Sequence, residues 1–390
     1  MKYGTLSTFM MKSLKRKRKM FREAFMNNRL KESVKRLVKN VQVLLLFIEF
    51  MFKPIHSSEK TVALVFNVSK WKRNYVQPYL KDYEVKFIPL GNPMFLLKFM
   101  MKRVPYKVIV NWGYSHEAAI QKLAKDEKVP IYRIEDGFLR SAGLGSMHTP
   151  PYSMCLDTKG MYFDSTKESD LEDILNHYDF SSDPVLLERS ENIIRQLLEL
   201  KVSKYNHVQE KDISELYGSK RRRRVLVIGQ VEDDASIKMG SRQAWTNNDL
   251  VRLAVKENPG DEVIYKPHPD VLMGRRERLS NPEEIMDIAK VIEEPLSIDD
   301  AFQTIDHLYT ITSLTGFEAM LRGIKVTTVG APFYSGWGLT DDRQEVSRRK
   351  RILSIEELFA GAYILYPAYI NPHTKKKISI EEAIDSIVKS

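Results

Sequence analysis

Short apolar runs alternate with amphipathic stretches along most of the chain, beginning near residue 61. Four of these runs precede residue 135 and have the length and composition of strands: Thr61–Val68, Tyr83–Leu90, Lys107–Asn111 and Ile131–Ile134. The residues before the fourth run, His116–Glu127, have the apolar spacing of a helix. Strands that alternate with helices predict a parallel sheet with helices on its faces.

The same alternation returns after residue 225. Helical spacing marks Asp249–Glu257 and Gly316–Arg322, and five further runs are typical of strands: Val225–Ile228, Glu262–Lys266, Val291–Glu293, Ile305–Ile311 and Val326–Val329. The pattern predicts an α/β protein with two Rossmann-like halves, whose ligands bind beyond the carboxyl ends of the strands. We expect five parts: a basic helical segment (1–57), a first half (58–205), a linker (206–224), a second half (225–348) and C-terminal helices that pack back on the body (349–390).

The positive charge of the chain is concentrated at its N-terminus. The net charge is +10, but residues 1–40 alone carry a net +11, so the rest of the chain sums to −1. Apolar residues recur at helical spacing from Leu30 to Ile48, between lysines and arginines. This predicts a basic amphipathic helix that attaches to an anionic membrane surface, or a solvated helix that caps the fold. The balanced charge of the main body argues against nucleic-acid binding.

Composition and known motifs exclude several classes of protein. The chain of 390 residues has a single cysteine, Cys155, which rules out an internal disulfide framework and a cysteine zinc site. The Walker A, HExxH, GxSxG and GxGxxG patterns are absent in a strand–helix context. Kinase, zinc protease, lipase and classical dinucleotide-binding activities are therefore not supported.

Polar clusters follow four of the predicted strands. Glu135 and Asp136 come directly after Ile131–Ile134, before a glycine-rich stretch that contains Arg140. Two carboxylates at a strand end can divide acid and base work between them, and Arg140 could hold an anionic group. The structural alternative is an aspartate that caps a helix.

The second cluster has three consecutive acids, Glu232 to Asp234, between Gln230 and Ser236. The carboxylate oxygens of these three acids are hard ligands that could bind a metal ion. One of the carboxylates could instead act as a nucleophile. The alternative is a solvated loop whose acids favour the start of a helix.

The third and fourth clusters have the residue types of a phosphate site. Lys266 and His268 follow Glu262–Tyr265, and prolines on both sides of His268 restrict its backbone. Ser313, Thr315 and Glu318 open a helix, where hydroxyls and free N–H groups can bind phosphate, although Thr315 and Glu318 also fit a capping box. An aromatic, glycine-rich loop at 330–341 fits a ligand frame or a packed turn equally well.

Together these motifs resemble the bacterial capsule-polysaccharide β-Kdo transferases, where Kdo is 3-deoxy-D-manno-octulosonate. The matching strings, in order, are IEDGFLRSAGLG, GQVEDDASI, YKPHPD, TSLTGFEA and PFYSGWGLTDD. The resemblance implies a GT-B fold, with two Rossmann-like domains facing a cleft, and transfer of Kdo from CMP-Kdo with retention. The acidic, His-Pro and Ser/Thr strings are also similar to those of bacterial sialyltransferases.

The resemblance also implies roles for individual residues. Glu135 and Asp136 would act as acid and base on the acceptor, and Asp234 would be the nucleophile. Asp233 remains an alternative to Asp234. Lys266 and His268 would face the phosphate of CMP, and the Ser313 cluster would hold phosphate and cytidine. Arg140, Gln230 and Ser236 are further candidates for substrate binding. The cationic side chains and the N–H groups of this phosphate site can stabilise the leaving group without a divalent metal, so we expect no metal and no cofactor.

The expected partners are CMP-Kdo, a lipid acceptor of the phosphatidylglycerol type or a saccharide acceptor, the inner face of the cytoplasmic membrane and other proteins of capsule assembly and polysaccharide transport. Many capsule linker enzymes carry two such modules, whereas this chain has room for one. Two alternatives remain open: a transferase of CMP-sialic acid or of a UDP- or GDP-sugar, and a non-catalytic adaptor for capsule assembly or export.

Overall fold

The computed structural model describes residues 60–88, 94–102, 104–143, 147–203 and 212–389, together with nine positions between 30 and 48. Those nine positions are helical and exposed, and eight of them are apolar: Leu30, Val34, Leu37, Val38, Val41, Leu44, Leu45 and Ile48. The predicted helix is confirmed at these positions, and the basic run at residues 15–19 lies outside the described residues. Among the described helices, none is long and apolar enough to cross a membrane.

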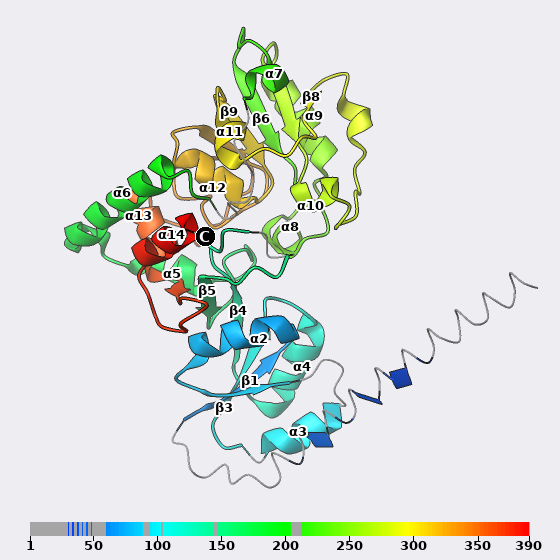
Figure 1. Ribbon diagram of the computed structural model, residues 1–390, viewed down its shortest axis with the longest axis vertical. Helices are drawn as coiled ribbons and strands as arrows, with labels where there is room; N and C mark the ends of the chain where they lie inside the picture. Colours follow the sequence, from blue (N-terminus) through cyan, green and yellow to red (C-terminus); the bar gives the residue numbers. More distant parts are fainter. Residues whose placement is uncertain are drawn as a thin grey trace, which may run out of the picture.

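The first half is built around a six-stranded sheet with the order β12-β5-β4-β3-β1-β2 (Figure 1). Its strands are β1 (Val62–Phe66), β2 (Glu84–Phe87), β3 (Lys107–Trp112), β4 (Ile131–Asp136), β5 (Ser153–Asp157) and β12 (Ala368–Tyr369). The first four run parallel, because helices connect them, while β5 is antiparallel to both β4 and β12. The sequence pattern did not indicate β5 or β12.

The second half has a sheet of the same size, with the order β11-β10-β9-β6-β7-β8, and all its pairs are parallel. Its strands are β6 (Arg224–Ile228), β7 (Glu262–Lys266), β8 (Lys290–Val291), β9 (His307–Thr310), β10 (Lys325–Thr328) and β11 (Asp341–Asp342). The central strand β6 is buried along its whole length, as its run of branched apolar residues predicts.

Helices connect the strands and cover the sheets. In the first half they are α2 (Lys70–Val76), α3 (Met94–Lys102), α4 (Glu117–Glu127), α5 (Asp170–His177) and α6 (Pro184–Glu199). In the second half they are α7 (Ser214–Tyr217), α8 (Ala235–Gly240), α9 (Asn247–Glu257), α10 (Pro269–Leu272), α11 (Ile298–Phe302) and α12 (Leu314–Met320). The C-terminal segment adds α13 (Ile355–Phe359), a π-helical turn (Ala360–Leu365) and α14 (Ile380–Val388).

A cluster of aromatic rings joins the two halves. Phe138, after β4, lies 4.4 Å from Phe333 and 5.4 Å from Tyr363, measured between ring centroids. Phe317 of α12 stacks on Tyr363 at 5.5 Å. The large core that contains these rings draws residues from both sheets and from the C-terminal segment, which returns beside α5 and α6 (Figure 1). The aromatic loop at 330–341 is therefore a packed turn at Phe333, Tyr334 and Trp337, which are all buried.

Candidate active site

The carboxyl ends of both sheets reach one short segment, Tyr162–Ser165. The ring of Phe163 lies close to Gly113, which follows β3, and the carbonyl oxygen of Phe163 lies close to Gly240, at the end of α8. Ser165 donates its backbone N–H to the carbonyl of Met239 at 3.1 Å. This segment therefore lies between the loop after β3 and α8, the helix that follows the acids after β6.

Asp136 lies between two cations at the end of β4. Its Oδ2 accepts hydrogen bonds from Lys72 Nζ at 2.9 Å and from Arg140 Nε at 2.8 Å. Burial opposes ionisation, but the two cations outweigh it, so the pKa of Asp136 lies below its usual range. Asp136 is therefore a carboxylate at neutral pH, and it can orient or accept but not donate a proton.

Arg140 is fully buried, so its contact with Asp136 positions that carboxylate. It also donates to the hydroxyl of Ser141 at 2.7 Å. Among the described residues, Arg140 Nη2 and Asp136 Oδ1 are buried atoms with no hydrogen-bond partner. Sequence reasoning missed Lys72, which α2 brings to Asp136 from directly beyond the end of β1.

Glu135 is the penultimate residue of β4 and accepts a hydrogen bond from the backbone N–H of Asp136 at 3.0 Å. Its other carboxylate oxygen faces Gly113, where a Cβ would approach it to 3.0 Å. Gly113 has φ +44°, a conformation that favours glycine, so the backbone at the end of β3 leaves room for this carboxylate. The Glu135 carboxylate therefore faces the loop after β3.

The three acids after β6 have three different environments. Glu232 accepts hydrogen bonds from the backbone N–H groups of Asn247 and Ser280, at 2.6 and 2.9 Å, and it holds two loops together. Asp233 is half-exposed and pairs with Arg276 at 2.5 Å. Asp234 caps α8, because its Oδ1 accepts from both the N–H and the hydroxyl of Ser236, at 2.9 and 2.8 Å.

The two carboxylate oxygens of Asp234 have different surroundings. Its Oδ2 accepts no hydrogen bond from any residue in the described ranges, while Oδ1 fixes the orientation of the carboxylate. A carboxylate held by one oxygen and open at the other has the geometry of a nucleophile or of a charge stabiliser. Ser236 contacts Asp234 and so acts through it.

His268 caps the short helix α10 and has a defined tautomer. Its Nδ1 accepts a hydrogen bond from the backbone N–H of Asp270 at 3.1 Å, so the ring proton of the neutral form is on Nε2. Burial lowers the pKa of His268, and the carboxylates of Asp270 and Asp234 only partly oppose this. His268 is therefore a neutral donor through Nε2–H, close enough to Asp234 to feel its charge. Lys266, the last residue of β7, is 5% exposed.

Gln230 lies in the interior. Its side-chain oxygen accepts from the backbone N–H of Thr312 at 2.8 Å, and its side-chain nitrogen donates to the Thr312 hydroxyl at 3.1 Å. The amide therefore links the end of β6 to the loop after β9. The structure places Gln230 as a positioning residue for the Ser313 loop.

The Ser313 cluster forms the start of α12. The hydroxyl of Ser313 accepts from the backbone N–H of Thr315 at 3.2 Å, and its carbonyl accepts from the hydroxyl of Tyr334 at 2.5 Å. Glu318 is 6% exposed and contributes to the raised pKa of Tyr334, for which burial is the main cause. Among the described residues, no group of three or more His, Cys, Asp or Glu side chains could hold a metal ion.

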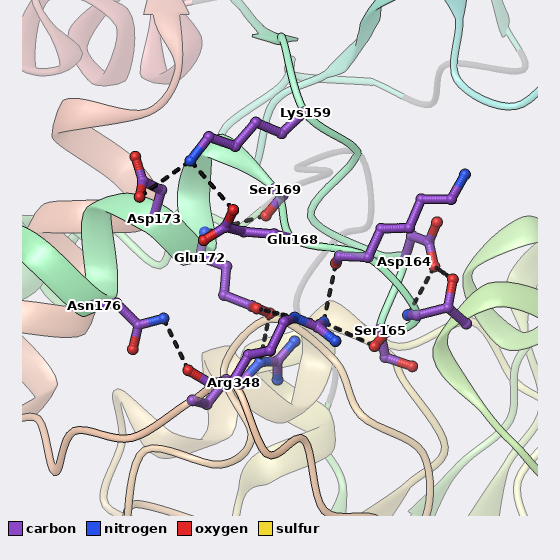
Figure 2. A network of polar contacts seen from close by, with 12 residues as sticks. Lys159, Asp164, Ser165, Glu168, Ser169, Glu172, Asp173, Asn176 and Arg348 are labelled. Atoms are coloured by element: carbon purple, nitrogen blue, oxygen red, sulfur yellow. Dashed lines mark hydrogen bonds and ion pairs between the residues drawn. The ribbon is translucent and has the colours of Figure 1, made fainter.

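An ion-pair network fixes the two halves relative to each other (Figure 2). Glu172 of α5 is 4% exposed and accepts from Arg348 Nε at 2.6 Å and from Arg349 Nε at 3.2 Å. Arg348 also donates to the carbonyl oxygen of Ser165 at 2.9 Å. Because Ser165 contacts α8, this network supports the segment that both sheet ends share.

Two parallel-strand halves with acidic, histidine and hydroxyl clusters at their strand ends define a protein of the GT-B class. The sequence profile of the family described as "Capsule polysaccharide biosynthesis protein" matches residues 107–371, and the chain belongs to this family. The expected GT-B-like fold and the expected family are confirmed.

Relatives of known name support this assignment. The chain is 44% identical over 329 residues to the lipopolysaccharide-processing protein LpsZ of Rhizobium meliloti, covering 84% of this chain and 74% of LpsZ. It is 39% identical over 324 residues to the capsule polysaccharide modification protein LipA of Neisseria meningitidis serogroup B, covering 83% of this chain. The match spans 45% of LipA, less than half of that protein.

Two solved structures from Thermosulfurimonas dismutans have the same fold. The β-Kdo 2,4 transferase of KpsC is 34% identical, with a TM-score of 0.72, and the match covers 83% of this chain and 98% of that one. The β-Kdo 2,7 transferase of KpsC is 32% identical, with a TM-score of 0.69, and the match covers 85% and 99%. The expected enzyme class, a glycosyltransferase, is confirmed.

Proposed function

We propose that this chain transfers Kdo from CMP-Kdo to a lipid-linked or saccharide acceptor in capsule polysaccharide synthesis, with retention of anomeric configuration. The observation that carries the proposal is that Asp234 and His268 follow the neighbouring parallel strands β6 and β7, so a carboxylate and an imidazole lie at the same end of the second sheet. The similarity to two Kdo transferases supports the choice of sugar.

In the first step, Oδ2 of Asp234 attacks the anomeric carbon of Kdo. The bond from that carbon to the phosphate oxygen breaks, and CMP leaves with the electron pair. The Nε2–H of neutral His268 donates a hydrogen bond to the departing phosphate, and the cationic Lys266 beside it stabilises the added charge. The product of this step is a Kdo ester of Asp234 and free CMP.

In the second step, an acceptor hydroxyl attacks the same carbon and displaces the Asp234 carboxylate. The hydroxyl proton passes to Glu135, the penultimate residue of β4. Asp136 remains ionised and, with Lys72, orients the acceptor. Two inversions at one carbon give net retention. The Ser313 and Thr315 hydroxyls bind the phosphate of CMP, and Glu318 contributes to binding of its cytidine.

The exposed apolar face between Leu30 and Ile48 supports attachment to the inner face of the cytoplasmic membrane. Each basic residue near an anionic surface adds about 1 kcal/mol, and residues 1–40 have a net charge of +11. A variant that lacks residues 1–40 is expected to keep activity on a soluble acceptor and to lose sedimentation with anionic vesicles. Unchanged sedimentation at moderate salt would refute the membrane role.

The decisive experiment incubates the protein with freshly generated CMP-Kdo and a Kdo-capped lipid acceptor. The expected product gains one or more Kdo masses, and its anomeric configuration matches that of the donor. Competition with free CMP and free UDP identifies the nucleotide. Stronger competition by UDP would favour a transferase of another sugar, and binding without turnover of any donor would favour an assembly or export adaptor.

A further inference from the structure

Three aromatic rings and a lysine from three separate segments meet at α2, where Tyr75 also packs against the core of the first sheet. Trp71 and Tyr75 are one helical turn apart, with ring centroids 6.2 Å apart. His148 lies over Trp71 at 4.7 Å, and Lys375 Nζ lies 4.0 Å from the centroid of Tyr75. We call His148, Trp71 and Tyr75 the aromatic row.

The row is accessible to solvent. Trp71 and Tyr75 are only partly buried, and His148 and Lys375 are exposed. The rings are tilted, by 30° between Trp71 and His148 and by 63° between Trp71 and Tyr75. Aromatic side chains that serve only the core of this protein, such as Phe138 and Phe317, are fully buried instead.

The row begins one residue from the candidate active site. α2 starts just beyond the carboxyl end of β1, and Lys72, next to Trp71, contacts Asp136 at 2.9 Å. The ammonium of Lys72 also lies 3.7 Å from the ring centroid of Trp112, the last residue of β3. A chain of sugars that reached Asp136 could therefore continue along α2.

The chemistry of the row fits an anionic saccharide. Aromatic faces carry partial negative charge and attract the polarised C–H groups of a sugar ring, with little dependence on sugar identity. Lys375 at one end and Lys70 at the other supply positive charge for carboxylates. Each Kdo residue of an oligosaccharide carries one carboxylate, so rings and charges match such a chain.

We propose that the aromatic row is a subsite for the sugar residues of the acceptor that precede the one receiving Kdo. This inference rests on the proposed function, since it takes Glu135 and Asp136 as the point of transfer. The subsite makes the enzyme prefer acceptors that already bear several Kdo residues. The opposing account is structural: the rings only hold the segment around His148 and the C-terminal segment against α2.

The experiment compares acceptors that carry one and three Kdo residues, at saturating CMP-Kdo. The variants are Trp71→Ala, Trp71→Phe and Tyr75→Leu, with Tyr106→Ala as the control. Tyr106 is 74% exposed and precedes β3, at the opposite end of the strands from the start of α2. We expect Trp71→Ala to raise KM for the three-residue acceptor about tenfold, with kcat within about twofold. KM for the one-residue acceptor should change less than about twofold, and Trp71→Phe should recover part of the loss.

Equal changes in KM for both acceptors, or no change for either, would overturn the subsite. Urea unfolding checks that each variant is folded, and the Tyr75→Leu and Trp71→Phe variants carry the test if Trp71→Ala is unstable. Binding of a free Kdo trisaccharide, followed by saturation-transfer NMR, separates the two hypotheses. A wild-type protein that binds the trisaccharide through Trp71 but transfers no Kdo would refute the proposed function and keep the subsite.

Discussion

The ammonium of Lys72 lies 2.9 Å from the carboxylate of Asp136, although 64 residues separate them along the chain. The contact exists because α2 begins beyond the end of β1 and Asp136 ends β4 in the same sheet. Arg140 adds a second cation on the same oxygen. Lys72 and Arg140 therefore control the charge of Asp136, one of the two acidic residues at the end of β4.

Replacing Lys72 with methionine should shift the pH dependence of transfer. Lys72 and Arg140 lower the pKa of Asp136 against the effect of burial, so wild type keeps the carboxylate ionised well into acid. Without Lys72 the pKa rises, and the acidic limb of kcat/KM moves to higher pH. The matched control is Lys81→Met, an exposed lysine nine residues further along the chain. An unchanged acidic limb in Lys72→Met would show that Asp136 ionisation does not limit transfer.

Wild-type turnover should be flat across the range where an ordinary histidine titrates. Burial lowers the pKa of His268, so the neutral ring predominates from pH 6.5 upwards and raising the pH removes no proton that the reaction uses. CMP release measured from pH 6.5 to 8 should show no loss attributable to His268. A loss of activity near pH 6.5–7 that His268→Asn abolishes would instead identify a protonated His268 as the acid.

Asparagine is the informative replacement for His268. Its side-chain oxygen can still cap α10, and its amide can still donate, whereas alanine removes both. We therefore expect His268→Asn to keep several-fold more activity than His268→Ala.

The alternation of strands and helices was readable from the sequence because each central strand is a run of branched apolar residues. β6 and β3 show this plainly, since every branched apolar residue in them is buried. β11 and β12 have two residues each, and their pairing depends on partners more than a dozen residues away, so no local pattern marks them. Tyr217 likewise lies in a charged stretch that reads as a linker, but it is buried by contact with Arg224 and the carbonyl of Ala301.

The candidate site was predictable in its residue types but not in its contacts. The strings around Asp136, Asp234 and His268 mark strand ends, where parallel sheets bind ligands. The environment of each acid depends on a contact partner that is distant in the sequence. The partners are Lys72 for Asp136, Arg276 for Asp233 and Ser280 for Glu232. The role of Gln230 shows the same limit, because only the fold brings Thr312 to its amide.

Replacing Glu172 with glutamine should destabilise the whole molecule. Glu172 is the buried acceptor for Arg348 and Arg349, and Arg349 is itself 9% exposed, so the change leaves a buried cation without its counter-charge. Removing one partner of a buried pair costs about 3–5 kcal/mol. We expect a lower midpoint of urea unfolding, followed by tryptophan fluorescence.

The control for this prediction is Glu168→Gln. Glu168 contacts Lys159 at 3.3 Å, both side chains are more than a third exposed, and such a pair is worth at most about 1 kcal/mol (Figure 2). Equal effects of the two changes would mean that Glu172 does not hold the halves together.

The last prediction separates the acids after β6. Asparagine is as good a helix cap as aspartate, so Asp234→Asn should keep α8 and CMP binding while it removes the nucleophile. An amide oxygen does not form a glycosyl ester, and transfer should fall at least about a thousandfold. Asp233→Asn breaks only an exposed ion pair with Arg276 and should change the rate less than about tenfold. Mass spectrometry of wild type with donor alone should find one added Kdo on the peptide that contains Asp234, and that mass should be missing from Asp234→Asn. If Asp234→Asn turns over normally while Asp233→Asn or Asp136→Asn does not, the nucleophile is that other residue. Double displacement requires one carboxylate of the enzyme to attack the anomeric carbon of the donor sugar.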